Sequence, residues 1–428
     1  MQLQLLAFDH AWSGNEEQGL IEPDGSSKQF HRRMRYPSAP AAATSSWRFV
    51  ASGQPAWSPV AMDVHHVWMV SKVYMIATKR ADVWVLLGPH RGDNHQVLAL
   101  AEGLGAPFRP IQMRYRWFAH LPAVMRSVAI SQLQPEARAE IAPPWPRLVI
   151  GIGQRSVPVA RYIKEASGGR TTIVRLGDPM VSPSYFDLVI TTPQYAVRDM
   201  ENVVRLPVTI TNPLIEPDPF EERWLESFPR PRRLIAVGGA TSLWDLRPST
   251  IRDAARTLLR AADRDGGSVI AVTSPRTSPR LAAAARSELG SLAVLDGDFP
   301  RYNALLSAAD EIHVTGDSVS MLSEAVKAGK PVGLIPLEPN PIGQLIRLVE
   351  ALRGRKFRIR DLTKFWNDLA AHGLVGTVEQ PRCGSLNADA LETAVSAVNA
   401  ALEGRLAETV VRIRVQGAPP RSARPAAG

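Results

Sequence analysis

The sequence has little cysteine and no long apolar run, and each shortage excludes a class of protein. A single cysteine, Cys383, excludes a disulfide framework, a zinc site of several thiolates and an iron–sulfur cluster. No stretch approaches the ~18 to 20 consecutive apolar residues of a membrane-spanning helix. No basic region followed by an apolar stretch marks a secretory signal. Hydrophobic residues make up 45% and charged residues 21% of the 428, which excludes a wholly disordered chain. We therefore expect a soluble, cytoplasmic protein.

Basic residues outnumber acidic ones, with Lys+Arg 50 against Asp+Glu 41 and a formal net charge of +9. Such a balance is typical of proteins that meet nucleic acid, an anionic membrane surface or phosphorylated substrates. The basic residues are spread over all segments and do not alternate with aromatic residues, so nucleic acid is not predicted as a partner. The charge is compatible with peripheral contact at the inner face of an anionic membrane.

Two parts of the chain alternate between short apolar runs and helical patterns. One apolar run covers residues 82–87 and is followed by a Gly-containing turn and a helical pattern. The unit recurs at 146–153 and, after a proline-rich interruption, from residue 234 onward. Strand, turn and helix in this order build a parallel sheet. We predict an α/β fold of two Rossmann-like domains facing across a cleft.

The pattern sets the expected domain boundaries. They are an irregular or disordered arm over 1–80, an N-terminal Rossmann-like domain over 81–212, a proline-rich connector over 213–233, a C-terminal Rossmann-like domain over 234–385, a terminal helix over 386–404 that Asn387 can cap, and a disordered tail over 405–428.

Ligands of open α/β sheets bind beyond the carboxyl ends of the strands, so we expect the ligand-binding residues in the loops that follow strands. The first of these loops runs from Gly88 to Gln96 and carries Asp93, which is suited to act as a general base. His90 or His95 would orient a substrate beside it. The alternative is that Asp93 only caps the following helix. The sequence leaves both open.

The loop from Gly151 to Ser156 resembles a dinucleotide fingerprint but has Ser156 where the third glycine belongs. Asp178, 25 positions beyond Gly153, could meet a ribose, but we favour a tight strand-to-helix turn as the explanation of the glycines. No Tyr-x-x-x-Lys pair follows, since Tyr162 and Lys164 are two positions apart and face different sides of a helix. A nicotinamide site is therefore not predicted.

Two post-strand loops of the C-terminal half are suited to hold a diphosphate. One contains Gly238 and Gly239, and the other contains Ser274 and Arg276. Backbone N–H groups and hydroxyls would approach the phosphate oxygens, and the planar guanidinium would neutralise their charge.

Residues 314–325 form the most informative segment. Asp317 or Ser318 can cap a helix whose N-terminus faces the predicted cleft, and Glu324 falls on the same face as Ser320, four positions earlier. A carboxylate at Glu324 would accept two ribose hydroxyls. The alternative is a solvent-exposed helix face without a ligand.

Asp296 and Asp298 flank a glycine after a short strand, a spacing at which two carboxylates can hold a divalent cation. Asp-Gly is also a common turn signal, and no further acidic residue lies close in sequence. We predict a turn here and no metal site.

Several strings together resemble a known family. They are GPHRGDNHQVLALAEGLG, GQRSVPVARYIK, the GDP after TTIVRL, TSPRT and ADEIHVTGDSVSMLSEAVKAGKPV. Between Val83 and Gly373 the chain resembles the mitochondrial fission family, which has members in plants and many in bacteria. That family is similar to GT-B glycosyltransferases, whose two Rossmann-like domains hold a nucleotide-sugar against the C-terminal domain. Bacterial members are often labelled nucleoside-diphosphate-sugar enzymes, epimerases included, and the plant branch is associated with recruiting a dynamin-related GTPase.

The resemblance implies a set of site residues. The donor would lie against Gly238, Gly239, Ser274, Arg276, Thr315, Asp317, Ser318 and Ser320, and Glu324 would take its ribose. The loop with His90 and Asp93 would face the acceptor, with Asp93 as the base of an inverting displacement. Enzymes of this kind generally work without a bound metal.

We therefore expect a GT-B glycosyltransferase that uses a nucleoside-diphosphate sugar, inverts the anomeric centre, needs no metal and carries no bound cofactor. Its acceptor would be lipid-linked or a component of the cell envelope. The alternative is a non-catalytic adaptor that keeps the fold and binds a protein or membrane partner.

Overall fold

The computed structural model describes residues 82–121, 127–296, 299–353, 360–404, 406, 410 and 413. All of them belong to one compact unit, residues 62–428. The predictions for residues 1–80, for most of 405–428 and for Asp298 lie outside the described residues.

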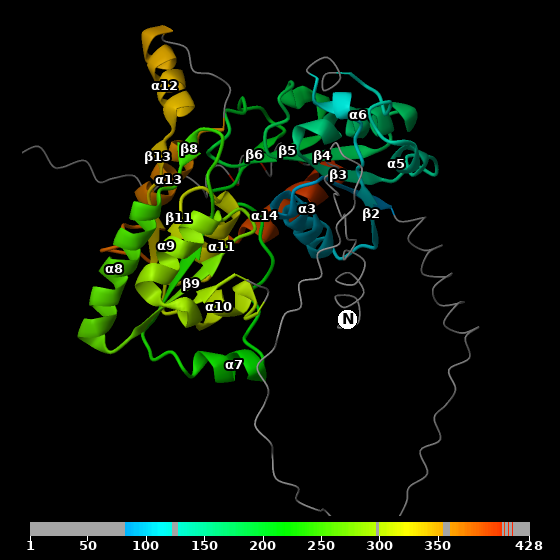
Figure 1. Cartoon of the computed structure of the whole chain (residues 1–428). Coiled ribbons are helices and arrows are strands. Elements are labelled where there is room, and N and C mark those ends of the chain that lie inside the picture. Colours follow the sequence, from blue (N-terminus) through cyan, green and yellow to red (C-terminus); the bar gives the residue numbers. More distant parts are fainter. Residues whose placement is uncertain are drawn as a thin grey trace, which may run out of the picture. The chain divides into compact units, whose positions relative to one another are not determined.

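The N-terminal sheet has six parallel strands in the order β2-β1-β3-β4-β5-β6 (Figure 1). Its strands are β1 (Val83–Leu87), β2 (Phe108–Gln112), β3 (Leu148–Ile152), β4 (Thr172–Leu176), β5 (Leu188–Thr191) and β6 (Val203–Arg205). Its helices are α3 (Arg91–Gly103), α5 (Pro135–Ala139) and α6 (Val157–Ala166), with 3₁₀ turns η2 (Trp117–His120), η3 (Gln154–Ser156) and η4 (Pro183–Tyr185). Every residue of β1, β3 and β5 is buried, as expected for central strands of a parallel sheet that is covered on both faces.

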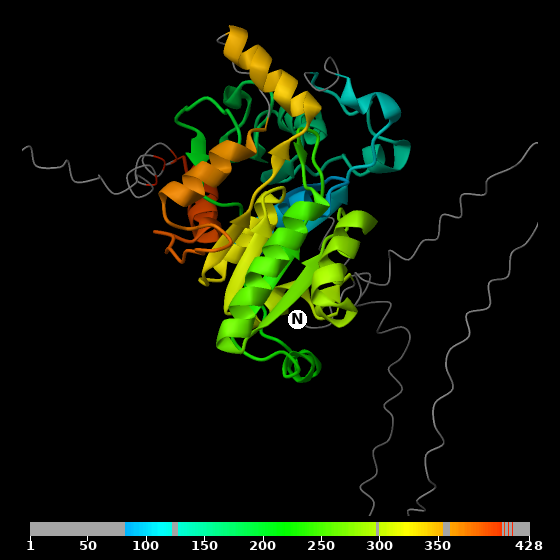
Figure 2. The same cartoon turned by 60° about the vertical axis from the view of Figure 1, so that its left-hand side comes forward.

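The C-terminal sheet has five parallel strands in the order β10-β9-β7-β11-β12. Its strands are β7 (Arg232–Val237), β9 (Ser268–Thr273), β10 (Val294–Leu295), β11 (Glu311–Thr315) and β12 (Val332–Ile335), and a separate antiparallel pair joins β8 (Trp244–Asp245) to β13 (Glu338–Pro339). The helices are α7 (Pro219–Leu225), α8 (Pro248–Asp265), α9 (Pro279–Leu289), α10 (Tyr302–Ala308), α11 (Val319–Lys327), α12 (Pro341–Arg353), α13 (Leu362–Ala371) and α14 (Ala390–Leu402), with the turn η5 (Ser291–Ala293). Figure 2 shows α8 lying along one face of this sheet.

The α/β class with two consecutive parallel sheets is confirmed, and two local predictions are wrong. The proline-rich connector is not irregular throughout, because Asp218 caps α7 and exchanges capping bonds with Glu221, while Pro219 occupies the first helical turn, where a proline is favoured. The last helix is capped by Asp389 rather than Asn387, since the Asp389 side chain accepts from the N–H groups of Leu391 and Glu392.

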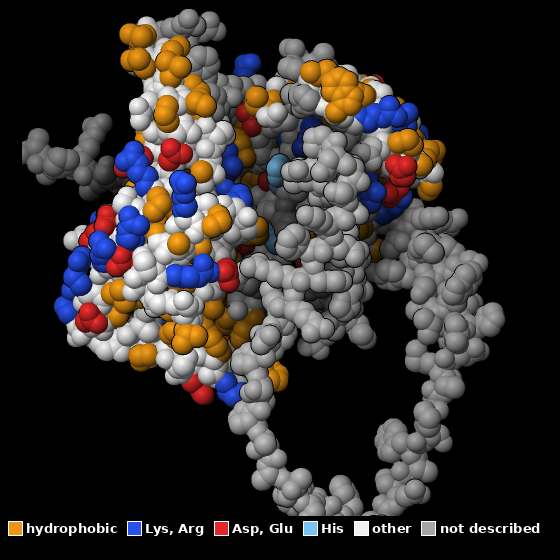
Figure 3. Space-filling view, in the orientation of Figure 1, with side chains coloured by type: hydrophobic (Ala, Val, Ile, Leu, Met, Phe, Trp, Pro, Cys, Tyr) orange, Lys and Arg blue, Asp and Glu red, His pale blue; other side chains and the backbone are white. Residues whose placement is uncertain are grey.

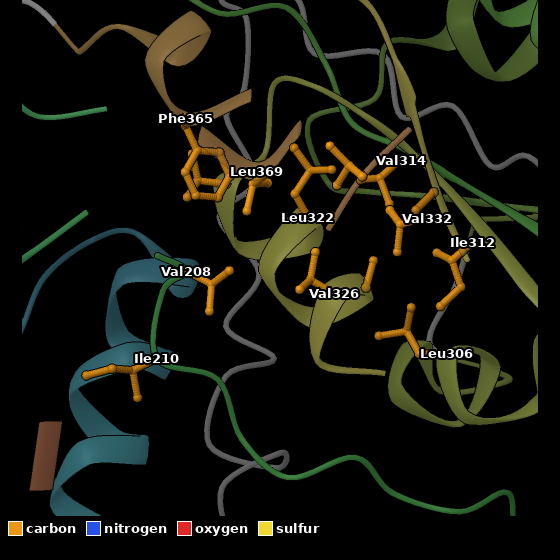
Figure 4. Packing of buried hydrophobic residues seen from close by; sticks show 14 of the residues in the cluster. Val208, Ile210, Leu306, Ile312, Val314, Leu322, Val326, Val332, Phe365 and Leu369 are labelled. Atoms are coloured by element: carbon orange, nitrogen blue, oxygen red, sulfur yellow. The ribbon is translucent and has the colours of Figure 1, made fainter. Parts of the chain in front are cut away.

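Segments far apart in sequence pack together around α11. Val208 and Ile210, which follow β6, belong to the same buried cluster as Leu322 of α11 and Phe365 of α13 (Figure 4). The Thr209 N–H donates to the Ser323 hydroxyl at 3.0 Å. The last helix, α14, packs against α3 of the N-terminal sheet, so the terminal helix does not stand apart from the two sheets.

Candidate active site

Each sheet has a topological switch point, where consecutive crossovers leave one strand in opposite directions. In the N-terminal sheet β1 lies between β2 and β3, and in the C-terminal sheet β7 lies between β9 and β11. Switch points are where open α/β sheets bind ligands. Asp93 lies in the first turn of α3, which follows β1, and Gly153 directly follows β3, while the loops after β7 and β11 carry Gly238 and Asp317. Most of the predicted site residues therefore lie at these two places.

Asp317 is the hub of the C-terminal switch point. Its side chain is fully buried, and its carboxylate accepts from Gly239 N at 3.0 Å, from the Thr315 hydroxyl at 2.7 Å and from Arg276 Nη2 at 2.7 Å. Thr315 is itself buried and accepts from Gly238 N at 2.8 Å. Since these bonds join the loops after β7, β9 and β11, Asp317 and Thr315 fix the shape of the site.

Gly238 and Gly239 are required by this packing. A Cβ on Gly238 would lie 2.1 Å from Asp317 Oδ2, and a Cβ on Gly239 would lie 2.2 Å from the backbone oxygen of Arg276. Their N–H groups, expected to meet a diphosphate, are already paired with Thr315 and Asp317. The two glycines thus bring the loops into contact.

Gly238→Ala is expected to lower the free energy of unfolding by at least about 2 kcal/mol, because the new methyl group overlaps a buried carboxylate that cannot move without losing its partners. Gly88→Ala is the matched control, since a Cβ at Gly88 meets nothing within 4 Å. Urea unfolding of both variants measures the difference. Equal midpoints would contradict the description of this loop.

The Arg276 guanidinium is paired with Asp317 through one nitrogen, and its other nitrogens face solvent. One arm of its guanidinium binds Asp317, and its remaining side-chain N–H groups make no hydrogen bond to the described residues. The side chain is 48% exposed. Ser274 lies in the same turn, where its hydroxyl accepts from Arg276 N at 3.3 Å and lies 3.2 Å from Thr277 Oγ1. The ion pair and the turn orient the Arg276 guanidinium, and its remaining N–H groups can donate hydrogen bonds to a ligand.

Helix α11 begins at the C-terminal switch point and touches the N-terminal sheet's first helix. The Ser318 hydroxyl caps α11 by accepting from Met321 N at 3.3 Å, one of the two caps expected from the sequence. The positive end of the helix dipole therefore lies in the loop that carries Asp317. Ser320 Oγ lies 3.6 Å from the position of a Cβ on Gly92, which belongs to the first turn of α3.

Glu324 lies one helical turn after Ser320 and is half-buried. Burial raises the pKa of its carboxyl from 4.5 to about 7. Within the described residues, no donor lies within hydrogen-bonding distance of this carboxylate. Glu324 is therefore not on a fully exposed helix face. The nearby Tyr302, which the sequence analysis did not single out, has a buried hydroxyl without a hydrogen-bond partner, and burial together with the Glu324 charge raises its pKa.

Asp93 is the corresponding carboxylate on the N-terminal side. It is the third residue of α3 and does not cap it, because the cap position is occupied by His90, whose exposed side chain makes no capping bond. Asp93 Oδ2 lies 4.0 Å from the position of a Cβ on Gly153. Burial raises the pKa of Asp93, and the positive charges of His90, Arg360 and Arg175 lower it in part.

Arg175, at the end of β4, explains the incomplete dinucleotide fingerprint. Its buried guanidinium donates to Gly153 O at 3.0 Å, Ser156 Oγ at 2.9 Å and Asp178 O at 3.1 Å. Burial lowers the pKa of Arg175 from 12.5 to about 10. Ser156 stands in place of the third glycine because its hydroxyl holds this cation. The Asp178 carboxylate accepts from Met180 N at 2.7 Å. Apart from its place near a strand end, no local pattern distinguishes Arg175 from other arginines of the chain.

Trp366 of α13 is a further residue that the sequence analysis missed. Its indole N–H donates to Gly316 O at 2.9 Å, and its ring atoms come within 2.7 Å of the position of a Cβ on Gly316. The ring also packs edge-on against Trp244 at 4.9 Å between centroids. Gly316 is thus a glycine because an aromatic ring covers it, and Trp366 holds the loop that presents Asp317.

The described residues contain no group of three or more His, Cys, Asp or Glu side chains placed to hold a metal ion. Asp296 instead forms an ion pair with Arg286 of α9. None of the described helices is both long and apolar enough to cross a membrane.

The chain matches the family described as Mitochondrial fission ELM1 over residues 91–383. A curated relative, the uncharacterized protein RP120 of Rickettsia prowazekii, is 26% identical over 120 residues, which are 28% of this chain and 33% of that protein. The match thus spans about a third of the relative's length.

Solved structures with a similar chain path share little sequence. One is the UDP-GlcNAc 2-epimerase of Neisseria meningitidis bound to UDP-GlcNAc, with 11% identity, a TM-score of 0.39, and coverage of 75% of this chain and 99% of that one. Another is Os79 from O. sativa in complex with UDP, with 12% identity, a TM-score of 0.38, and coverage of 77% and 100%. A third is the spinosyn forosaminyltransferase SpnP, with 14% identity, a TM-score of 0.40, and coverage of 79% and 96%. The family match, by contrast, contains every site residue described above except His90.

Proposed function

The chain belongs to the Mitochondrial fission ELM1 family, and from that premise we propose that it is a GT-B-type glycosyltransferase with a nucleoside-diphosphate sugar as donor. One observation carries the proposal. Helix α11 carries Glu324, a half-buried carboxylate without a donor, and through Ser320 it touches the turn of α3 that carries Asp93. Two half-buried carboxylates that accept no hydrogen bond from the described residues are typical of binding and catalytic sites.

The donor would be held at the C-terminal switch point. The open arm of Arg276 and the first N–H groups of α11 would meet the diphosphate, because both present positive charge at one place. Glu324 would accept two ribose hydroxyls once it is ionised. With these groups neutralising the diphosphate, the proposed reaction needs no metal and no bound cofactor.

The transfer itself would use Asp93 as the general base. Asp93 would take the proton of an acceptor hydroxyl while that oxygen attacks the anomeric carbon from the side opposite the diphosphate. The bond from the anomeric carbon to the diphosphate oxygen breaks, and the configuration inverts. Arg276 and the N-terminus of α11 would stabilise the charge that develops on the leaving diphosphate.

Arg276→Ala is expected to weaken the binding of the preferred nucleoside diphosphate at least tenfold, since a charged hydrogen-bond donor to the diphosphate is lost. Isothermal calorimetry of the variant and of Arg260→Ala, an exposed arginine of α8, gives the comparison. Equal affinity in wild type and Arg276→Ala would remove Arg276 from the site. If no nucleotide binds the wild type, the adaptor alternative is favoured.

We also propose that a lipid-linked acceptor is reached by contact of α12 with an anionic bilayer. Hydrophobic side chains gather over this helix in Figure 3. Ile342, Leu345, Leu348 and Leu352 are 56% to 76% exposed and recur every three or four positions along it. An apolar helix face on a chain with a net charge of +9 fits a negatively charged membrane surface.

The double change Leu345→Gln and Leu348→Gln is expected to abolish co-sedimentation with phosphatidylglycerol-containing vesicles, because it removes apolar area from the exposed face. Leu292→Gln, which alters a leucine that is 88% exposed elsewhere, should leave sedimentation unchanged. Absence of wild-type binding to these vesicles would contradict membrane contact through α12.

A further inference from the structure

A pocket of about 570 Å³ lies between the loop that follows β5 and one face of α13. Its lining includes Tyr195 from the loop and Lys364, Asn367 and Asp368 from α13. The Asp361 N–H donates to Gln194 O at 2.9 Å and fastens the start of α13 to this loop. The pocket is a shallow groove that is open to solvent, so a ligand would contact it on one side.

The two faces of α13 differ in chemistry. Phe365 and Leu369 are fully buried on one face, in the cluster of Figure 4. The other face presents an ammonium, an amide and a carboxylate to the pocket. Neither the Lys364 ammonium nor the Asn367 side-chain amide has a hydrogen-bond partner in the described part of the chain. These groups are therefore free to contact a ligand.

Two cations, Arg205 and Lys364, and one carboxylate, Asp368, line the pocket, and one of the cations is already paired outside the lining. Arg205 contributes a guanidinium, but it is paired with Asp199 at 2.9 Å and also donates to Val197 O at 3.0 Å. Asp368 balances Lys364, and its carboxylate is 3.8 Å from His372 Nδ1. Burial raises the pKa of Asp368, while His372 and Arg205 lower it. With no excess of positive charge, the pocket suits a neutral ligand better than a phosphate or a carboxylate.

The available groups match hydroxyls in particular. A carboxylate only accepts, an ammonium only donates, and an amide does both. A hydroxyl both donates and accepts, so neighbouring hydroxyls on one ring can use all three groups at once. The Tyr195 ring and the apolar loop side chains add a surface for the C–H face of a sugar ring.

We infer that this pocket binds a neutral sugar unit through Tyr195, Lys364, Asn367 and Asp368. Its assignment as the acceptor subsite rests on the proposed function. The pocket lies beside the carboxyl end of β4, the strand that carries Arg175, because the Tyr195 ring lies 3.5 Å from the position of a Cβ on Gly177, the residue after that strand.

Saturation-transfer NMR with the methyl glycosides of glucose, galactose, mannose and N-acetylglucosamine tests the inference. We expect transfer to at least one glycoside, and about tenfold weaker binding in Asn367→Ala and in Asp368→Asn, because each loses a hydrogen bond to the sugar. Asn399→Ala, an exposed asparagine of α14, should bind as wild type does. Transfer to none of the four glycosides, or equal binding by all variants, overturns the inference.

Nucleotide calorimetry on the same preparations separates this pocket from the proposed function. If glycosides bind and the binding depends on Asn367 and Asp368, but no nucleotide binds, sugar binding in the pocket is supported and the proposed glycosyltransferase function is rejected. Nucleotide binding without glycoside binding rejects the pocket alone.

Discussion

Glu324→Gln is expected to abolish nucleotide binding and, at the same time, to stabilise the unliganded protein above pH 7. The carboxylate is half-buried without a donor, so its ionisation opposes folding. Glutamine has nearly the same shape and no charge. A residue kept only for structure would not be expected to cost stability in this way, whereas a ligand-binding residue commonly does.

The sign of the pH dependence follows from the raised pKa of Glu324. The protonated carboxyl favours the folded state, so its full contribution is present below the unfolded-state value of 4.5 and is lost as pH rises through about 7. A shift from 4.5 to about 7 corresponds to roughly 3 kcal/mol. Wild type should therefore lose stability between these pH values, and Glu324→Gln should lose less.

Urea unfolding between pH 5 and pH 8 measures this effect, and calorimetry measures nucleotide binding by the same variants. Glu165→Gln, which alters an exposed glutamate at the end of α6, is the matched control and should change neither. Nucleotide binding by the wild type should strengthen as pH rises through about 7, because only the ionised carboxylate accepts both ribose hydroxyls. A Glu324→Gln variant that binds nucleotide as wild type does would disprove the ribose role.

Asp93→Asn is expected to reduce kcat by roughly 10² to 10⁴ while leaving donor affinity unchanged. The amide cannot take a proton, but it keeps the size of the side chain. The assay follows release of the nucleoside diphosphate from the donor that calorimetry identifies. Loss of donor affinity together with kcat would instead assign Asp93 to donor binding.

The pH dependence of kcat/KM supplies a second readout for Asp93. A base must be ionised, so activity should fall as pH falls through the pKa of Asp93, which burial raises from its ordinary value. Arg360→Gln removes a charge that lowers this pKa, so the acidic limb should move to higher pH. A limb at the same pH in both proteins would contradict the role of Arg360.

The sheets were predictable from sequence because their central strands are continuous apolar runs that end in glycine turns. VWVLL of β1 and LVIGI of β3 are buried at every position. Short edge strands such as β6, and helix α13, were not predicted, since three residues or a single ten-residue amphipathic segment give little periodic signal. Once the strands were predicted, the loops that follow them indicated the approximate place of the site.

Individual roles within the site depend on contacts that no local pattern contains. Gly238 looks like a phosphate-binding glycine, yet its neighbour is Asp317, 79 positions further along the chain. Glu324 lies on a helix pattern that looks exposed, and its neighbour Tyr302 comes from α10, which no local pattern connects to α11. Arg175 and Trp366 act through bonds to Gly153 and Gly316, whose partners are set by tertiary packing.

Calorimetric titration of the wild-type protein with UDP, GDP, ADP and CMP, beside NAD(H), shows whether this chain binds the nucleotide part of a sugar donor. We expect one nucleoside diphosphate to bind and NAD(H) not to bind. A bound nucleotide at a hundredfold excess over Kd should also stabilise the fold by about 2.7 kcal/mol. Binding of no nucleotide in the panel, or of NAD(H) alone, would contradict a nucleotide-sugar transferase.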